Sequence, residues 1–545
     1  MLHIGRSQVW ARLTTSQQAE KVVTGWLKAD ARPLSTTIGQ QVTKVETFTD
    51  DHGEPIYYIV YLHPSGFVIV PADDLVEPII GFADDGTYNP TLQNPLAALV
   101  RPDLNGRVTA VRANHGLRVK ASTIRDAQSK WHQFISLAEV SEGRFTAMGL
   151  SSVSDLRVAP LVKSKWSQRN VCGQYCYNYY TPNNYPSGCV ATAMAQLMRY
   201  HQHPTTGVGL HEFTIKVDGS EQRAFTLGGD QFGGAYIWSD MALVPDCNTT
   251  ETQRRAIGAL CYDAGVSVNT AYRSDGASAD MLIAKDALTT IFKYENAIKG
   301  HNDGHNIGPA LISMVNPNLD CGAPVILGLL REKGGHAVLC DGYGYNASTL
   351  YHHLNMGWAG SDDAWYNLPN VEARYMYTSV MACVYNIFVS GTGEIISGLV
   401  TDVFGNPISG ATVTAEGGGE PYNATTGANG IYALAKIPSA TTYTVGVTKP
   451  GYLFTDQTVT TGTSRDLSRT SGNRWEINFV GILVGDFDRD SDVDIVDFAI
   501  LASSWLTKPS DVQWNPACDI SSPADNLIDM LDLAAFADNW LAGVE

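Results

Sequence analysis

The sequence lacks any run of eighteen consecutive apolar residues, the length that a membrane-spanning helix requires. Its first six residues, Met1 to Arg6, also lack the basic n-region and apolar h-region of a signal peptide. We therefore expect no transmembrane segment. Two explanations of the missing signal remain: loss through a misplaced start or trimming, or a protein that stays inside the cell. We favour loss of the signal peptide, and we expect a secreted or cell-surface protein.

Positive charge is scarce, with 37 Lys and Arg against 55 Asp and Glu and a net charge of −18. Nucleic acids and anionic membranes require clustered basic residues, so neither is expected as the main partner. Residues 486–545 contain twelve Asp and one Glu against Arg489 and Lys508, so about −11 of the net charge lies there. Such a local concentration indicates a cation site.

Cysteine occurs nine times, and no pair has the CxxC spacing that would suggest zinc. One reactive thiol together with some disulfides fits an exported enzyme. The spacing leaves the connectivity of any disulfides open. The cysteines are Cys172, Cys176, Cys189, Cys247, Cys261, Cys321, Cys340, Cys383 and Cys518.

A chain of 545 residues exceeds what one hydrophobic core supports, so three or four domains are expected. Residues 1–150 contain an amphipathic helical stretch at 17–27 and strand-like runs at 57–62 and 66–70. Residues 151–392 mix helical and strand patterns and contain the candidate catalytic residues. Residues 393–480 have short β runs separated by turn signals, and residues 481–545 contain an internal repeat.

A candidate nucleophile, Cys189, follows a loop at Pro186 to Gly188 and precedes apolar residues at helical spacing. The pattern predicts a buried helix that begins at Cys189. The unpaired N–H groups and the dipole of a helix N-terminus favour the thiolate, which is the nucleophilic form of cysteine. The alternative is a small buried cysteine used for packing.

A candidate base, His336, starts a strand-like segment that leads into turn residues and a second strand ending at Asn355. If the hairpin is centred between Tyr345 and Asn346, paired residue numbers sum to 691 and His336 faces Asn355. An amide oxygen against one imidazole nitrogen fixes the tautomer and leaves the other nitrogen for a thiol. By itself, a strand histidine is more often a core or surface residue.

Three blocks resemble the signatures of streptopain-like (C10 family) cysteine peptidases: Gly188 to Ala193, Gly335 to Gly342, and His353 to Gly360. Residues 66–82 also resemble the inhibitory propeptide of that family. The resemblance implies an α+β papain-like fold at 151–392, with a helical half carrying Cys189 and a β half carrying His336. It further implies an α+β inhibitory propeptide at 1–150.

The same resemblance implies that the protein is a cysteine endopeptidase, which acts on protein substrates and needs no catalytic cofactor. Gln168 would donate to the oxyanion together with the Cys189 N–H. His336 would be the base and Asn355 would orient it. Gly188, Gly335 and Trp358 would support the cleft.

One residue departs from the family pattern, because Met356 follows Asn355 where the family usually has Trp. Methionine would cover an Asn–His hydrogen bond less rigidly, which allows lower activity without implying loss of all chemistry. The departure keeps an alternative open: a non-catalytic surface or scaffold-binding protein that retains a degenerate peptidase fold.

The segment 393–480 has the turn spacing of a β-sandwich, for example at Gly405 to Pro407 and at Lys449 to Tyr452. It resembles the carboxypeptidase regulatory-like, transthyretin-type sandwich. We expect an all-β domain without catalytic residues.

The acidic C-terminal segment begins with aspartates at positions 1, 3, 5, 9 and 12 of a loop that precedes a helix. Hard oxygen ligands at this spacing predict calcium. The proposed ligands are Asp486, Asp488, Asp490, Asp494 and Asp497. Ser491 stands where an EF loop usually has Gly, and Asp497 is shorter than the usual Glu. A second copy keeps Asp529 and Asp532 but is irregular before them, so a distorted or weak site is expected.

Two similar helices are predicted at 497–506 and 532–541, offset by 35 residues. The doubled loop and helix resemble a type I dockerin, which implies a small α-helical calcium-binding domain at 481–545 and a cohesin-like docking partner. The alternative is an acidic solvated tail without a defined fold.

Overall fold

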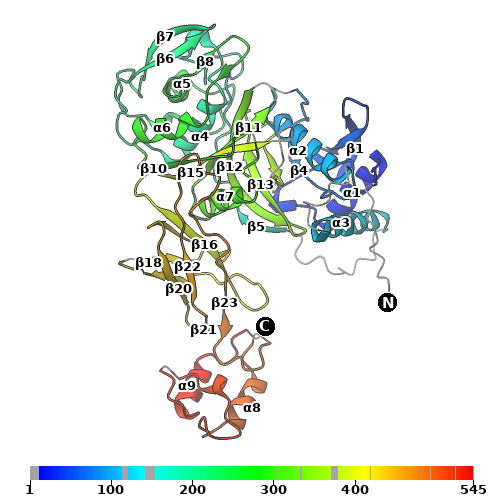
Figure 1. Ribbon diagram of the computed structural model, residues 1–545, viewed down its shortest axis with the longest axis vertical. Coiled ribbons are helices and arrows are strands. Elements are labelled where there is room, and N and C mark those ends of the chain that lie inside the picture. The colour runs from blue at the N-terminus through cyan, green and yellow to red at the C-terminus, as the bar shows by residue number, and fades with distance from the viewer. Residues whose placement is uncertain are drawn as a thin grey trace. The chain divides into compact units, whose positions relative to one another are not determined.

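The computed structural model describes residues 12–91, 93–112, 121–140, 154–303, 305–331, 334–369, 379–417, 419–490, 492–521 and 523–543. The chain divides into two compact units (Figure 1). The first comprises residues 1–391 and 465–471, and the second comprises residues 392–464 and 472–545. Each unit is described by itself below.

The N-terminal region of the first unit, residues 12–140, begins with helix α1 (Ser16–Ala29). Thr15 and Gln18 form a reciprocal capping box, which satisfies N–H groups at the start of the helix. Ala19, Val22 and Trp26 recur at helical spacing and are fully buried. The helix predicted at 17–27 is therefore confirmed.

Four strands follow α1, namely β1 (Gln41–Thr49), β2 (Pro55–His63), β3 (Phe67–Pro71) and β4 (Gly81–Ala83). Helices α2 (Pro95–Arg112) and α3 (Ala121–Glu139) complete the region. Even-numbered residues such as Tyr58 and Val60 pack in one core with α1 and α3. On the opposite face, Tyr57 and Phe67 contact Tyr88. Both faces of the sheet are covered, which explains why β2 and β3 are apolar almost throughout.

This sheet continues into the following part of the chain, because β4 pairs with β14 (Ala364–Tyr366). Within the described residues the order is β1-β2-β3-β4-β14-β13-β12-β11-β15-β10, with β5 beside β12. A Cβ atom on Gly81 would lie 2.8 Å from the Trp365 carbonyl oxygen, so the junction requires glycine. The remaining strands are β5 (Ser154–Val158), β10 (Asn296–His301), β11 (Val325–Arg331), β12 (Gly334–Asn346), β13 (Thr349–Asn355) and β15 (Val380–Phe388).

The helical part of the first unit is built around α4 (Cys189–His201), in which every residue from Val190 to Met198 is buried. Helices α5 (Glu251–Ser267) and α6 (Ile283–Thr290) pack in the same hydrophobic core, while α7 (Ala310–Asp320) lies against β15. Ala337 and Leu339 of β12 also belong to that core. A helical half and a β half therefore meet along α4 and β12 (Figure 1), as expected for residues 151–392. A small sheet joins β6 (Glu212–Val217), β7 (Ser220–Phe225), β8 (Ala271–Tyr272) and β9 (Ala277–Ser278).

Buried hydrogen bonds connect the N-terminal region to the strands that follow it. Trp26 Nε1 donates to Asn346 Oδ1 at 2.6 Å, and Tyr366 OH donates to Asp103 Oδ2 at 2.7 Å. Arg107 pairs with Asp103 at 2.9 Å and donates to both the side chain and the carbonyl of Asn367, at 2.7 and 2.6 Å. The N-terminal region is thus held by polar contacts as well as by the continuous sheet.

The second unit contains a β-sandwich, as predicted from the turn spacing. One sheet has the order β19-β16-β23 and the other has the order β18-β17-β20-β22. Alternate residues face a shared core, for example Val413, Tyr443 and Val445. The strands are β16 (Glu394–Thr401), β17 (Thr412–Glu416), β18 (Tyr422–Thr425), β19 (Ile431–Ile437), β20 (Thr442–Thr448), β22 (Gln457–Thr460) and β23 (Phe479–Val480), and a separate pair is β21 (Tyr452–Leu453) with β24 (Ile482–Leu483).

Two short helices end the chain, α8 (Ile495–Ser503) and α9 (Met530–Asp538). Leu501 of α8 and Phe536 of α9 share a core with Val493. The prediction of two similar packed helices is confirmed, although both begin two residues earlier than predicted. Asp494 and Asp529 are the N-caps, because carboxylates accept hydrogen bonds from the free N–H groups of a first turn.

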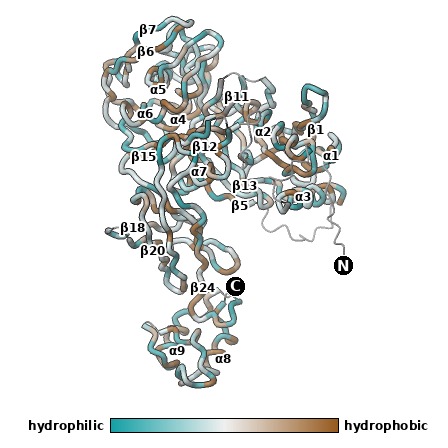
Figure 2. The backbone as a smooth tube through the Cα atoms, viewed as in Figure 1, coloured by the Kyte–Doolittle hydropathy of each residue, from teal (hydrophilic) through white to brown (hydrophobic). Residues whose placement is uncertain are grey.

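Hydrophobic residues are distributed in short stretches along the chain (Figure 2). In the described residues, no helix combines the length and apolar character needed to cross a membrane.

A test of the contact between the N-terminal region and the strands is Arg107→Ala. The change leaves the buried Asp103 carboxylate without its cation, so we expect the free energy of unfolding to fall by about 3 kcal/mol. Chemical denaturation followed by tryptophan fluorescence measures this. Arg101→Ala, an exposed arginine on the same helix, should change the value by less than about 0.5 kcal/mol. Equal effects of the two substitutions would contradict the assigned contact.

Candidate active site and acidic loop

Cys189 is the first residue of α4, as the sequence predicted, and its side chain is half-buried. Gly188 is the N-cap with φ 95°, a left-handed conformation that favours glycine. Glycine has no side chain with which to cap the helix, so the first N–H groups of α4 are not bound by an N-cap side chain. These groups favour a thiolate at Cys189. Cys172 and Cys247 form a disulfide, whereas Cys189 is not part of a disulfide.

Gln168 lies beside the loop that leads into α4. Its carbonyl oxygen accepts a hydrogen bond from Ser187 N–H at 2.9 Å, two residues before Cys189. The hydroxyl of Thr192, one turn into α4, lies 3.3 Å from the Ser167 carbonyl oxygen. The segment that carries Gln168 is therefore held against the start of the helix.

His336 lies near the start of β12 and is partly exposed. The next residue, Ala337, packs in the core that also contains α4, and Cys189 packs against that same core. A Cβ atom on Gly335 would lie 2.7 Å from the Leu329 carbonyl oxygen, so glycine is required where β12 approaches β11. The helix that begins at Cys189 and the strand that carries His336 therefore contribute residues to one shared core.

The predicted pairing of His336 with Asn355 is wrong. Asn355 is paired with Leu339, and His336 is paired with Leu329 on the other side of β12. The hairpin turns at Ala347 and Ser348, which both have positive φ, instead of between Tyr345 and Asn346. An irregularity between Cys340 and Gly342 then shifts the register back by one residue, so Asn355 faces Leu339 instead of Cys340. Neither feature could be placed from strand pattern alone.

The side chain of Asn355 is buried, and both its oxygen and its nitrogen are hydrogen-bonded. Its Nδ2 donates to the Ser164 carbonyl oxygen at 3.0 Å. Its Oδ1 accepts from Gln196 Nε2 at 2.9 Å and from Gly357 N–H at 3.1 Å. Asn355 is thus connected to α4 and to the segment that leads to Gln168.

The loop after Asn355 folds against the same segment. Ala359 N–H donates to the Trp166 carbonyl oxygen at 2.9 Å, which fixes the position of the neighbouring, half-buried Trp358. Met356 is 1% exposed, and its N–H donates to Asp363 Oδ1 at 2.8 Å. The residue that departs from the family pattern is therefore a packed part of this loop.

A charged cluster beside this loop was not assigned any role from the sequence. His353 Nδ1 lies 2.7 Å from Asp341 Oδ1, and Asp341 Oδ2 accepts from Val162 N–H at 2.9 Å. Burial lowers the pKa of His353, but the Asp341 carboxylate outweighs this and raises it overall. Burial raises the pKa of Asp363 to about 6, although the charge of His353 opposes the shift.

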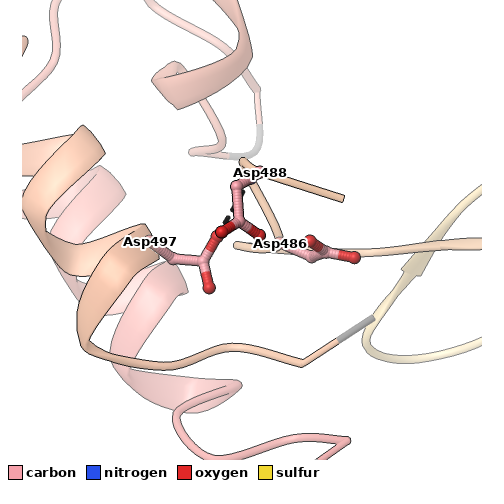
Figure 3. A group of neighbouring side chains, drawn as sticks. All are labelled: Asp486, Asp488 and Asp497. Carbon is pink, nitrogen blue, oxygen red and sulfur yellow. Dashed lines mark hydrogen bonds between the residues drawn. The ribbon is translucent and has the colours of Figure 1, made fainter. Parts of the chain in front are cut away.

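The acidic loop before α8 brings carboxylates together as predicted. Ligand oxygens of Asp486, Asp488 and Asp497 lie within 4.8 Å of one another. Figure 3 shows the first two on the loop and Asp497 in the first turn of α8, where it accepts from Asp488 N–H at 3.2 Å. Partial desolvation, with the charges of Asp497 and Asp490, raises the pKa of Asp488. Mutual repulsion of this kind is relieved by a cation.

A second group of oxygens in the loop comes from Asp490, Asp492 and Asp497. Asp492 Oδ1 is buried and has no hydrogen-bond partner among the described residues. Asp494, by contrast, accepts from Val496 N–H at 2.7 Å as the N-cap of α8. The donor set consists of hard oxygens and fits calcium, which prefers six to eight such ligands. Asp492, which was not proposed from the sequence, belongs to this group, whereas Asp494, which was proposed, belongs to neither group among the described residues.

The second copy keeps part of this geometry. Asp532 accepts from Ile520 N–H and Ser521 N–H, as Asp497 does from Phe487 N–H and Asp488 N–H. Two extra residues separate its first aspartate, Asp519, from the helix. The insertion accounts for the irregular pattern seen in the sequence.

Comparison with known families identifies three segments. Residues 166–366 match the Peptidase C10 family, residues 11–102 match the Spi protease inhibitor family, and residues 395–470 match the carboxypeptidase regulatory-like domain. The inhibitor match lies in the N-terminal region, and the regulatory-like match lies in the β-sandwich.

Individual relatives agree with these families. Streptopain from Streptococcus pyogenes serotype M1 is 25% identical over 338 residues, covering 61% of this chain and 79% of streptopain. The thiol protease/hemagglutinin PrtT from Porphyromonas gingivalis is 25% identical over 305 residues, covering 54% of this chain and 32% of PrtT. A prointerpain A fragment from Prevotella intermedia is 22% identical with a TM-score of 0.47, covering 63% of this chain and 98% of the fragment.

The matches to the inhibitor and peptidase families define a cysteine peptidase that carries a propeptide. Residues 166–366 match the Peptidase C10 family and are similar to streptopain, and residues 395–470 match the carboxypeptidase regulatory-like domain. The alternative of a non-catalytic binding protein is not favoured by these relatives.

The raised pKa of Asp363 predicts how stability depends on pH. Below pH 3.8 the group is protonated in both states, and stability is lost as pH rises through about 6 because burial disfavours the carboxylate. Asp363→Asn still accepts from Met356 N–H and cannot ionise. We expect it to raise the free energy of unfolding by about 2 kcal/mol at pH 7.5 and to leave it unchanged near pH 3.5.

Chemical denaturation at the two pH values measures this difference. Asp126→Asn, an exposed aspartate of the same unit, is the control and should have no effect at either pH. An Asp363→Asn effect of equal size at both pH values would contradict the assigned cause.

Proposed function

We propose that the chain is a secreted cysteine endopeptidase made as a self-inhibited zymogen. The observation that carries the proposal is the position of Cys189 at the start of α4, a helix that shares its core with the strand that carries His336, in a segment that matches the C10 family. The absence of a side-chain cap at Gly188 leaves the dipole and N–H groups of the helix to favour the thiolate.

In the proposed reaction, the Cys189 thiolate attacks the peptide carbonyl carbon and forms the C–S bond while the carbonyl electrons move to oxygen. Gln168 and the Cys189 N–H stabilise the oxyanion. Protonated His336 gives its proton to the amine as the C–N bond breaks. His336 then removes a proton from water, which attacks the thioester and releases the acid and the thiolate. No metal or cofactor takes part.

Asn355 is proposed to act on His336 through its carboxamide oxygen. In this structure that oxygen already accepts two hydrogen bonds, which fill its two lone-pair directions. To orient His336, Asn355 Oδ1 must therefore either accept a further hydrogen bond or lose one of these two donors when the precursor matures. This agrees with a precursor whose N-terminal region shares a sheet with the strands of the catalytic half.

The C-terminal helices are proposed to form a dockerin-like, calcium-binding module that attaches the enzyme to a cohesin-like partner. The cation ligands are Asp486, Asp488, Asp490 and Asp497, with Asp494 acting through water as position nine of such loops often does. The two capped helices packed on one core support this assignment.

Autoprocessing tests the catalytic proposal. Under mild reductant, the full chain should release an N-terminal fragment of about 150 residues, and Cys189→Ala should reduce the rate by more than about a thousandfold because the nucleophile is gone. Mass spectrometry follows the fragment. Cys321→Ala removes another half-buried cysteine that is not part of a disulfide and should process at the wild-type rate. Release at the wild-type rate from Cys189→Ala would remove Cys189 from the mechanism.

Calcium titration tests the acidic loop. Asp497 belongs to both groups of carboxylates, so Asp497→Asn should weaken calcium binding by the full chain about 100-fold, since ligand charge sets the affinity of such loops. Isothermal titration calorimetry gives the value. Asp538→Asn, at the exposed end of α9, removes equal charge outside the loop and should have little effect. Identical isotherms for wild type and Asp497→Asn would exclude the site.

A further inference from the structure

Gln196 is a polar residue inside α4, a helix that is buried from Val190 to Met198. It lies on α4 between Ala195 and Leu197, and its side chain is 1% exposed. A buried amide is costly unless each of its groups is hydrogen-bonded. The partners of Gln196 therefore explain its presence in this core.

Backbone groups fix the orientation of the Gln196 amide. Trp166 N–H donates to Gln196 Oε1 at 3.0 Å, and Ser164 Oγ donates to the same atom at 3.0 Å. Because a backbone N–H can only donate, this oxygen must face Trp166, and Nε2 must face Asn355 Oδ1 at 2.9 Å. The Asn355 amide is fixed in the same way by the Ser164 carbonyl and the Gly357 N–H.

Through these bonds, Gln196 connects three elements of the proposed site. It lies seven residues after Cys189, which is nearly two turns and about 10 Å along the same helix face. It binds Trp166, two residues before Gln168, and it binds Asn355 directly. One side chain thus joins the nucleophile helix, the segment of the oxyanion donor and the end of β13.

We propose that Gln196 is a positioning residue of the peptidase, which holds Asn355 and the segment 164–168 in register with the start of α4 through its N–H donor to Asn355. The inference rests on the proposed function of Cys189, His336, Gln168 and Asn355. Small displacements of catalytic groups cost rate more than substrate binding. Loss of the donor should therefore lower kcat and leave KM nearly unchanged.

Gln196→Glu isolates the donor, because glutamate has the same shape and still accepts from Trp166 and Ser164. Above its pKa the carboxylate presents a lone pair to Asn355 Oδ1 instead of an N–H. A buried glutamate has a raised pKa, so at low pH the neutral carboxyl O–H can donate to Asn355 in its place. Gln196→Met has similar length and can donate at no pH.

Other titratable groups surround the network and must be accounted for. They are His353, Asp341 and Asp363 on the strand side, Lys165 beside Ser164, and Cys189 on α4. All are present in wild type and in both variants. The ratio of variant to wild-type kcat at each pH therefore reports on position 196.

The experiment uses full-length precursors processed with a trace of wild-type enzyme, and measures kcat and KM on a quenched fluorescent casein peptide at pH 5.5 and pH 8. We expect Gln196→Glu to lose about 10- to 100-fold in kcat at pH 8, with KM changed less than about twofold. At pH 5.5 its ratio to wild type should recover to within about threefold, while Gln196→Met stays low at both pH values.

Each other outcome decides against the proposal. Wild-type kcat for Gln196→Glu at pH 8 would overturn the positioning role while the proposed function stands. Equal losses for both variants at both pH values would show only a packing role. An inactive wild type would overturn the proposed function and this inference together.

Thermal melts report whether the variants fold. If Gln196→Glu is unfolded, Ser164→Ala replaces it, because it removes only the hydroxyl bond to Gln196 and keeps the carbonyl bond to Asn355. A loss of about threefold in kcat at constant KM would then support the proposal, and unchanged kcat would overturn it.

Discussion

The packing of α4 against the inner face of β12 is the contact on which the rest of the catalytic half depends. A helix that is buried from Val190 to Met198 can only form inside a core, and β12 supplies one wall of that core with Ala337 and Leu339. The residues proposed for catalysis, Cys189 and His336, are the first residue of α4 and a residue near the start of β12, and both are partly exposed. Hydrophobic burial therefore determines how the two elements that carry the proposed site are packed.

Polar groups then fix the relative positions of elements that apolar packing alone does not determine. Apolar contacts are not directional, so they allow α4 to shift relative to the strands, whereas hydrogen bonds fix distances and orientations. The amides of Gln196 and Asn355 bind the carbonyl and N–H groups of the segment 164–166. A buried hydrogen-bonded network of this kind favours one arrangement of the elements that it joins.

Specific polar contacts are also found in the N-terminal region and in the acidic loop of the second unit. The N-terminal region extends the sheet of the catalytic half through β4 and β14, so the propeptide is held by backbone pairing as well as by Arg107 and Tyr366. In the second unit, aspartates serve two purposes, since Asp494 caps α8 while Asp486, Asp488 and Asp497 gather as oxygen ligands. Carboxylates this close repel one another, which is the physical reason to expect a cation.

By itself, the sequence determined the local features that follow from short-range chemistry. These include the helix that begins at Cys189, the α1 helix, the sandwich rhythm and the spacing of the acidic loop, because helical periodicity, turn residues and ligand spacing are written in neighbouring positions. Gln196 stands out in the sequence as an amide side chain among apolar residues of a predicted buried helix, but its hydrogen-bond partners could not be inferred. Only the tertiary structure decided the register of β12 and β13, because a two-residue turn at Ala347 and Ser348 and an irregularity at Asp341 move Asn355 from His336 to Leu339. This pairing depends on where the hairpin turns and where the strand is irregular, and the apolar pattern of a strand specifies neither.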